Sequence, residues 1–255
     1  MSEEPENLAE GTLISHLLEL RSRLIRALVA VGICFVPCAY YSNQIFTFIA
    51  RPLLEKLPKG GSLIATGVMT PFTTPFKLSF FVALFVAMPY VLYQEWAFVG
   101  PGLSRREKRF AVPLMVSSVL LFYAGVIFAY VVVFPMVFAF FTSTTPQGVS
   151  MMTDITSYMD FALTMFLAFG IAFEVPVAVV LLVLTGIIKL EKLKANRGYV
   201  LIAIFIIAAI LTPPDALSQC VMAVPMYLLY EGGVVMAQIM QRMQRTAAER
   251  DAAKI

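Results

Sequence analysis

Six apolar stretches separated by short polar segments constrain this chain more than any other feature of its sequence. A helix needs about 20 apolar residues to cross roughly 30 Å of hydrocarbon. Of all residues, 60% are hydrophobic and 14% are charged, whereas soluble domains carry about 25% charged residues. Such a chain cannot hide its apolar surface from water by folding on itself. We therefore predict an integral membrane protein.

The apolar stretches predict an all-α fold with six transmembrane helices. They cover residues 27–41, 75–98, 111–141, 157–188, 199–211 and 216–236. Pro113 and Pro135 are expected to mark the ends or kinks of the third helix. The fifth has only twelve strictly apolar residues, from Val200 to Leu211, and we expect the last two helices to be short. A further short helix is expected at the membrane surface in the stretch IFTFIARPLLEKL.

The basic residues predict which loops face the cytoplasm. Of the 19 Lys and Arg residues, 15 lie before the first helix, in the loops after the second and fourth helices, and in the tail, while the alternate loops hold 4. Short cytoplasmic loops collect Lys and Arg. We therefore expect one domain over residues 1–255 with both termini in the cytoplasm. Residues 1–22 form its amphipathic lead-in and residues 237–255 its charged tail.

Sequence motifs typical of enzymes are absent. The chain has no H-E-x-x-H, no G-x-S-x-G and no phosphate-binding G-x-x-x-x-G-K-[ST], so any energy must come from partners or from the membrane potential and proton gradient. His16 is the only histidine, and Cys34, Cys38 and Cys220 lie in apolar runs, where we expect small buried residues. We predict no catalytic residue, no metal and no cofactor. The net charge of +3 is too small to indicate nucleic-acid binding.

One acidic residue stands in the middle of a predicted span. Glu174, in LAFGIAFEVPVAVVLL, has at least ten uncharged residues on either side. A central charge costs roughly 2.5 to 3.5 kcal/mol to insert, so such residues suggest a function. A hydroxyl partner or a protonated carboxyl would be a structural explanation. The alternative is a proton-coupled carrier of small solutes, although the other spans lack the polar partners that a solute site needs.

Structural roles fit the remaining acids. Glu19 precedes Arg23 by four residues in HLLELRSRL, the favourable orientation for an ion pair within one helix, and the spacing alone favours that role. Glu107 fits a basic loop, and Glu95 fits a membrane interface. Asp215 fits a helix N-cap, and the Glu231 side chain could reach toward the membrane surface.

Five strings taken together resemble the TatC family, the multispanning receptor subunit of the twin-arginine protein translocase. They are HLLELRSRL, YQEWAFVGPGLSRREKR, LFYAGVIFAYVVVFP, FGIAFEVPV and LTPPDALSQ. They follow in order over most of the chain, from about Leu13 to Met240. The resemblance implies six helices in a cupped, concave arrangement in a bacterial inner membrane. It also implies a protein that is not an enzyme.

The resemblance further implies a function. Family members recognise twin-arginine signal peptides on folded cargo proteins. They then assemble in the lipid bilayer with the single-span subunits TatA and TatB into a higher-order complex, and the proton-motive force drives export.

The resemblance also implies residue roles. The signal arginines would be bound by Glu19 and Glu107, since carboxylates form strong bidentate bonds with guanidinium groups. For Glu19 this implication takes precedence over the ion pair. Other residues also match family positions. Arg21, Phe98 and Glu95 would take part in signal binding, and Glu174 would be a polar site within the membrane. Pro52, Asp215 and Gln219 would take part in partner binding or assembly. In this concave arrangement we expect the Glu174 carboxyl to face the concave side and to act on a partner helix or on the bilayer. We also expect the outer edge at the short fifth helix, with Ile204 and Met222 as crosslinking positions, to bind a partner's single helix and to thin the membrane locally.

Overall fold

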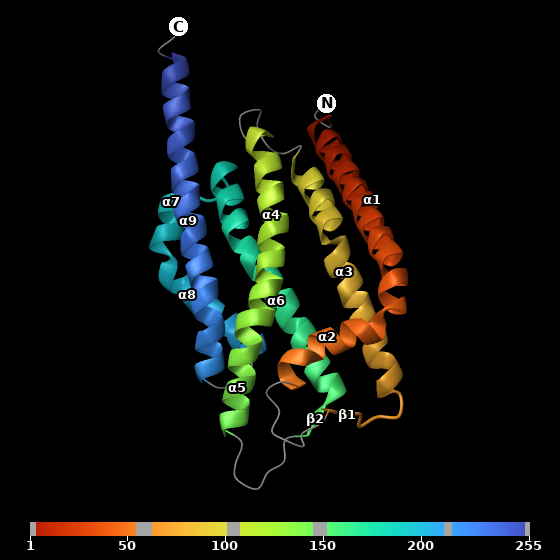
Figure 1. The fold of residues 1–255 in the computed structure, drawn as a ribbon. Coiled ribbons are helices and arrows are strands. Elements are labelled where there is room, and N and C mark those ends of the chain that lie inside the picture. The colour runs from red at the N-terminus through yellow and green to blue at the C-terminus, as the bar shows by residue number, and fades with distance from the viewer. Residues whose placement is uncertain (1–3, 55–62, 101–107, 145–151, 212–215, 253–255) are drawn as a thin grey trace. The chain divides into compact units, whose positions relative to one another are not determined.

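The computed structural model describes residues 4–54, 63–100, 108–144, 152–211 and 216–252, and nearly all of them are helical (Figure 1). The helices are α1 (Glu4–Tyr40), α2 (Ser42–Leu54), α3 (Thr70–Val99), α4 (Lys108–Phe128), α5 (Phe134–Thr144), α6 (Ile155–Leu184), α7 (Leu190–Ala195), α8 (Arg197–Leu211) and α9 (Ala216–Ala252). Two short strands, β1 (Leu63–Ile64) and β2 (Thr153–Asp154), pair in parallel. The predicted all-α class is confirmed, and α2 confirms the short helix expected after the first span.

Five apolar segments are long enough to cross a membrane. They are Ile14–Tyr40, Thr70–Val99, Phe110–Phe140, Ile155–Leu184 and Gln219–Met243, and Arg197–Ile210 adds a shorter apolar helix. The six predicted spans are therefore present, although the first begins well before residue 27. Leu13 to Leu24 continue into it without a helix breaker, so the lead-in and the first span form one helix.

The last helix is longer than predicted. α8 has 15 residues, as expected for a short span, but α9 is a single helix of 37 residues. The expectation that both of the last two helices are short needs correcting. Beyond residue 236 the sequence AQIMQRMQRTAAERDA is rich in strong helix formers and has no Gly or Pro to end the helix.

A π-helical segment interrupts the third span. It covers Ala129–Val133 and joins α4 to α5. Pro135, the second residue of α5, has no N–H to donate to the carbonyl of Val131, the i−4 position. Widened π-turns are common where a helix loses a backbone bond in this way. The predicted disturbance at Pro135 is confirmed, whereas Pro113 lies inside the regular helix α4.

The chain divides into two compact units, described separately. The first comprises Met1–Phe46 and Phe72–Met115. In it, α1 packs along α3 through a small apolar core of Val31, Cys38, Ala83 and Ala87. The hydroxyl of Ser79 on α3 also donates to the backbone carbonyl of Cys38, at 3.2 Å.

The second unit comprises Thr47–Pro71 and Val116–Ile255, with α6 at its centre. α6 packs mainly against α9, and α8 packs on α9 as well. Backbones approach closely where glycines leave room, as is common between membrane helices. A Cβ at Gly233 on α9 would lie 2.7 Å from the Cα of Pro176, and one at Gly125 on α4 would clash with the backbone carbonyl of Phe169.

Asp154 links the β-pair to the start of α6. One carboxylate oxygen accepts hydrogen bonds from the backbone N–H groups of Thr156 and Ser157, both at 3.1 Å, and so caps the helix. The other oxygen accepts from the hydroxyl and the N–H of Thr66, at 2.9 and 3.3 Å. These bonds, led by that from the Ser157 backbone, lower the pKa of Asp154 below its usual value. The DITS sequence carries this N-cap signal, but sequence analysis did not use it.

Candidate functional site

A polar cluster in the first unit contains the first predicted recognition residue. On α1, the Nε and Nη2 atoms of Arg23 donate to the Oε1 atom of Glu19, at 2.9 and 2.6 Å. The Nη1 atom of Arg23 lies 3.4 Å from the Oε1 atom of Gln94 on α3. The ion pair predicted from the i,i+4 spacing is confirmed. Among the described residues, the Oε2 atom of Glu19 receives no hydrogen bond.

Burial differs across this cluster. The side chain of Glu19 is 37% exposed and that of Arg23 21%, whereas Gln94 is buried. The carboxylate is therefore the part of the cluster that an external cation can reach. Arg23 lies between this carboxylate and a buried amide.

An aromatic contact lies on the same two helices. The ring of His16 on α1 stacks on that of Phe98 on α3, with centroids 4.2 Å apart and planes at 25°. Arg21 and Glu95 are exposed. The structure thus brings Glu19 and Phe98 onto neighbouring helices, and Arg21 and Glu95 onto the surfaces of the same helices. Glu107 and Asp215 lie outside the described residues.

Pro52 lies within α2, in the second unit. Its missing N–H leaves the carbonyl of Phe48 without the usual i,i+4 donor. The Tyr130 hydroxyl donates to this carbonyl at 2.9 Å, and the two rings stack with centroids 5.1 Å apart. The hydroxyl of Tyr158, which is buried, donates to the next carbonyl, that of Ile49, at 2.7 Å. Hydroxyls of two tyrosines, one in the π-helical segment and one in α6, thus donate to carbonyls in the turn of α2 that precedes the proline.

Glu174 lies in the middle of α6 and is partly buried. Among the described residues its Oε1 atom is buried and accepts no hydrogen bond, although the residue has another interaction. One carboxylate oxygen is therefore inside the protein, while the residue as a whole is partly exposed; the orientation of the carboxyl toward the concave side stays a prediction. Phe173 and Pro176, on the same helix, lie against Gly125 and Gly233.

The predicted partner-facing positions differ in burial. Gln219 is partly buried on α9, but Ile204 and Met222 are 7% and 1% exposed. The expectation that these last two mark an outer edge is therefore wrong. Ile204 and Ala208 form the stripe of α8 that is buried, and the opposite stripe of Ile202, Ile206 and Ile210 is exposed. Cys220, expected to be buried, is exposed as well.

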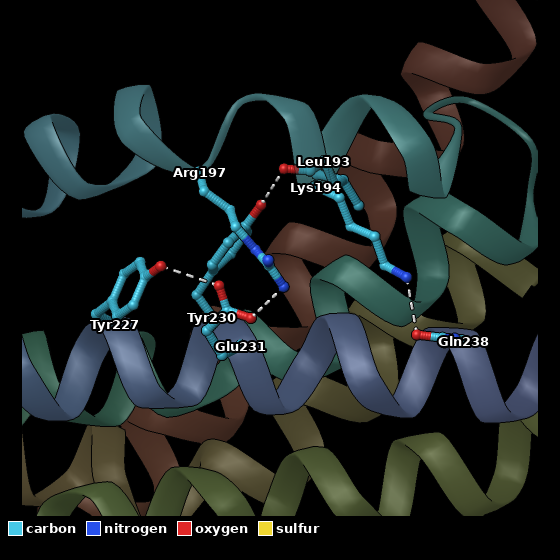
Figure 2. Close-up of polar contacts among 7 residues, drawn as sticks. All are labelled: Leu193, Lys194, Arg197, Tyr227, Tyr230, Glu231 and Gln238. Carbon is cyan, nitrogen blue, oxygen red and sulfur yellow. Dashed lines mark hydrogen bonds and ion pairs between the residues drawn. The ribbon is translucent and has the colours of Figure 1, made fainter.

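A second polar cluster joins α7 and the start of α8 to α9 (Figure 2). The Nη2 atom of Arg197 lies 2.7 Å from one carboxylate oxygen of Glu231, and the Tyr227 hydroxyl donates to the other at 3.0 Å. Two more bonds run from Lys194 Nζ to Gln238 Oε1 and from the Tyr230 hydroxyl to the carbonyl of Leu193, both at 2.9 Å. This cluster was not predicted from the sequence, which suggested instead that the Glu231 side chain reaches toward the membrane surface.

Comparison with known proteins decides the family. The sequence model described as "Sec-independent protein translocase protein (TatC)" matches residues 15–225. The chain belongs to the TatC family. It is 50% identical over 248 residues to TatC of Azotobacter chroococcum mcd 1, with 97% of each chain covered. It is 52% identical over 229 residues to TatC of Haemophilus influenzae (90% of each chain) and 47% identical over 222 residues to TatC of Escherichia coli K12 (87% of this chain, 86% of the relative).

The fold agrees with this assignment. A crystal structure of a twin-arginine translocase receptor, TatC, superimposes with a TM-score of 0.78 at 35% identity, covering 88% of this chain and 98% of that one. The chain is thus a multi-pass membrane protein of the TatC family and a component of the Sec-independent protein translocase. Membership of this family does not favour the alternative of a solute carrier.

Proposed function

We propose that this TatC-family chain recognises twin-arginine signal peptides of folded proteins, nucleates assembly of the translocation complex and uses the proton-motive force, with no enzymatic activity of its own. The observation that carries the proposal is the Glu19 carboxylate. It is half-exposed on α1 beside α3, and its Oε2 atom receives no hydrogen bond from the described residues. A signal arginine could bind there by a charge-assisted hydrogen bond.

The second recognition residue we propose is Glu107. Its support is the motif SRREKRF, residues 104–110 of the sequence. Two carboxylates match two signal arginines in number and charge, and each would accept a planar guanidinium fork. Phe98, Arg21 and Glu95 lie on the same two helices as Glu19 and Gln94, α1 and α3, and we propose that they contact the residues next to the arginine pair.

The test is equilibrium binding of a synthetic twin-arginine signal peptide to the full chain in lipid nanodiscs. Glu19→Gln and Glu107→Gln should each weaken binding roughly tenfold or more, because a hydrogen bond to a charged group contributes about 1.5–3 kcal/mol. Glu191→Gln, which changes an exposed acid on α7, is the matched control and should bind like the wild type. Unchanged affinity in both site variants would contradict the proposal.

We further propose that the chain assembles with the single-span subunits TatA and TatB in a bacterial inner membrane. The exposed stripe of α8, Ile202, Ile206 and Ile210, offers an apolar face for a partner's single helix. At 15 residues, α8 is about 22 Å long, shorter than the hydrocarbon layer, and such a mismatch is relieved by thinning the bilayer or by contact with a neighbour.

Glu174 is proposed to take part in partner docking or transport rather than in signal binding. The cost of an ionisable group within a membrane helix supports a functional role. Glu174→Ala should therefore keep insertion and signal binding but reduce transport of a twin-arginine reporter. Glu174→Gln should be milder, because it keeps a hydrogen-bonding group. Full transport by Glu174→Ala would mean that the residue is structural.

A further inference from the structure

We propose that Arg23 is an internal competitor of the signal arginine. Arg23 occupies the recognition carboxylate of Glu19 when no peptide is bound. This inference rests on the proposed function, because it concerns the same site. It adds a residue with a regulatory role that the sequence motifs do not assign.

The geometry explains why the two arginines exclude each other. Arg23 directs two N–H groups at a single oxygen, Oε1 of Glu19, at 2.9 and 2.6 Å. A signal guanidinium that binds in the bidentate mode needs both oxygens of the carboxylate. A second guanidinium on the same carboxylate would also face the positive charge of the first. Full binding of a signal arginine therefore requires Arg23 to leave Oε1.

Gln94 makes that departure possible. Its Oε1 atom lies 3.4 Å from Nη1 of Arg23, and its side chain is buried on α3. Among the described residues, this is the one other hydrogen bond of Arg23. A partly buried cation with no acceptor would be costly to desolvate. Because the amide can accept from Arg23 after Glu19 is released, the guanidinium can move without losing all of its polar partners.

The size of the effect follows from the exposure of the pair. Partly exposed ion pairs are weak, so the barrier that Arg23 sets to signal binding is modest. Arg23→Gln should raise the affinity for the twin-arginine peptide about twofold to fivefold. Gln94→Leu should lower it, because Arg23 then has no second acceptor and stays on Glu19. A purely structural role for the cluster would weaken binding in both variants.

Selectivity gives an independent readout. A twin-lysine peptide has less need of this release, because an ammonium group can bind the free Oε2 atom of Glu19 alone. Arg23→Gln should therefore raise the affinity for a twin-arginine peptide more than that for its twin-lysine counterpart, so the preference for arginine should increase. If Arg23 instead oriented Glu19 for a bidentate fork, its loss would reduce the preference for arginine, since an ammonium group needs no such orientation.

The experiment measures binding of both synthetic peptides to the full chain in nanodiscs. The variants are Arg23→Gln, Arg23→Lys and Gln94→Leu, with Arg26→Gln, an exposed arginine of the same helix, as the matched control. Arg23→Lys keeps the charge without the fork and should lie between the wild type and Arg23→Gln. Opposite signs for Arg23→Gln and Gln94→Leu, with an increased preference of Arg23→Gln for the twin-arginine peptide, are the expected result.

Weaker or unchanged binding in Arg23→Gln would overturn the competitor role. Glu19→Gln, measured in parallel, separates the two hypotheses. If Glu19→Gln binds like the wild type, the proposed recognition site itself fails. If it binds weakly while Arg23→Gln is not strengthened, only the inference about Arg23 fails.

Discussion

At the scale of single residues, polar groups in this chain are matched to backbone groups that would otherwise lack a partner. The carbonyl of Phe48 loses its helical donor to Pro52 and receives the Tyr130 hydroxyl instead. An unsatisfied carbonyl in a membrane protein costs several kcal/mol when no water can reach it. The structural role of Pro52 therefore includes the Tyr130 hydroxyl, which replaces the helical donor that the proline lacks.

This pairing predicts a non-additive pair of substitutions. Tyr130→Phe should lower the free energy of unfolding by about 1 kcal/mol, but by much less in a Pro52→Ala background, where the new N–H can bond to Phe48. The measurement is denaturant unfolding in mixed micelles, followed by helicity. Tyr199→Phe is the control, because the residue Tyr199 is 76% exposed. Equal effects of Tyr130→Phe in both backgrounds would refute the pairing.

Asp154 predicts a dependence of stability on pH. Its pKa is lowered in the folded chain, mainly by the Ser157 N–H and by Thr66, so the carboxylate stabilises the fold above the unfolded-state pKa, near 3.9. That contribution is lost as the pH falls through the lowered pKa. Unfolding measured between pH 6 and pH 2 should show a loss that Asp154→Asn lacks. A variant with the same acid profile as the wild type would contradict this role.

At the scale of secondary-structure elements, α8 illustrates what a sequence can and cannot predict. Its length and apolar character follow from the run Val200 to Leu211. Its buried face does not, because a helix that is apolar all round has no amphipathic pattern to show which side packs. Placing Ile204 outside was an error of this kind. The ion pair of Arg197 with Glu231 was likewise not predictable, because the two residues are 34 positions apart. The ion pair of Glu19 with Arg23 lies within one turn of a helix, so its spacing predicted it.

The exposed stripe of α8 predicts the positions that capture partners. Photo-crosslinkers at Ile206 and Ile210, 56% and 78% exposed, should capture a single-span subunit in an active complex. A crosslinker at the buried Ile204 of the same helix is the matched control and should capture little. Capture of lipid alone from the exposed positions would exclude this helix as a docking site.

At the scale of the whole molecule, the distribution of charge predicts the orientation in the membrane. The six apolar helices and the 15-to-4 division of basic residues together favour cytoplasmic termini. Family membership accounts for what hydropathy could not indicate, namely that the chain serves a protein translocase. Glu107 and Asp215 are assigned their roles from the sequence motifs.

The orientation predicts the outcome of labelling with a membrane-impermeant thiol reagent. In a background without Cys34, Cys38 and Cys220, engineered cysteines at Gly60 and Gln147 should react from outside the cytoplasmic membrane. Cysteines at Lys108 and Lys192 should react only after the membrane is opened. The reverse pattern would reject the proposed topology.

Site-specific crosslinking of a signal peptide to the full chain tests the receptor role most directly. A photo-reactive residue at Leu20, exposed beside Glu19, is compared with one at Ile187, which is 71% exposed on the connection before α7. We predict that a twin-arginine peptide crosslinks at Leu20 but not at Ile187, and that Glu19→Gln or a twin-lysine peptide sharply reduces the product. Equal crosslinking at both positions, or a Leu20 product indifferent to Glu19 and to the arginine pair, would contradict the account.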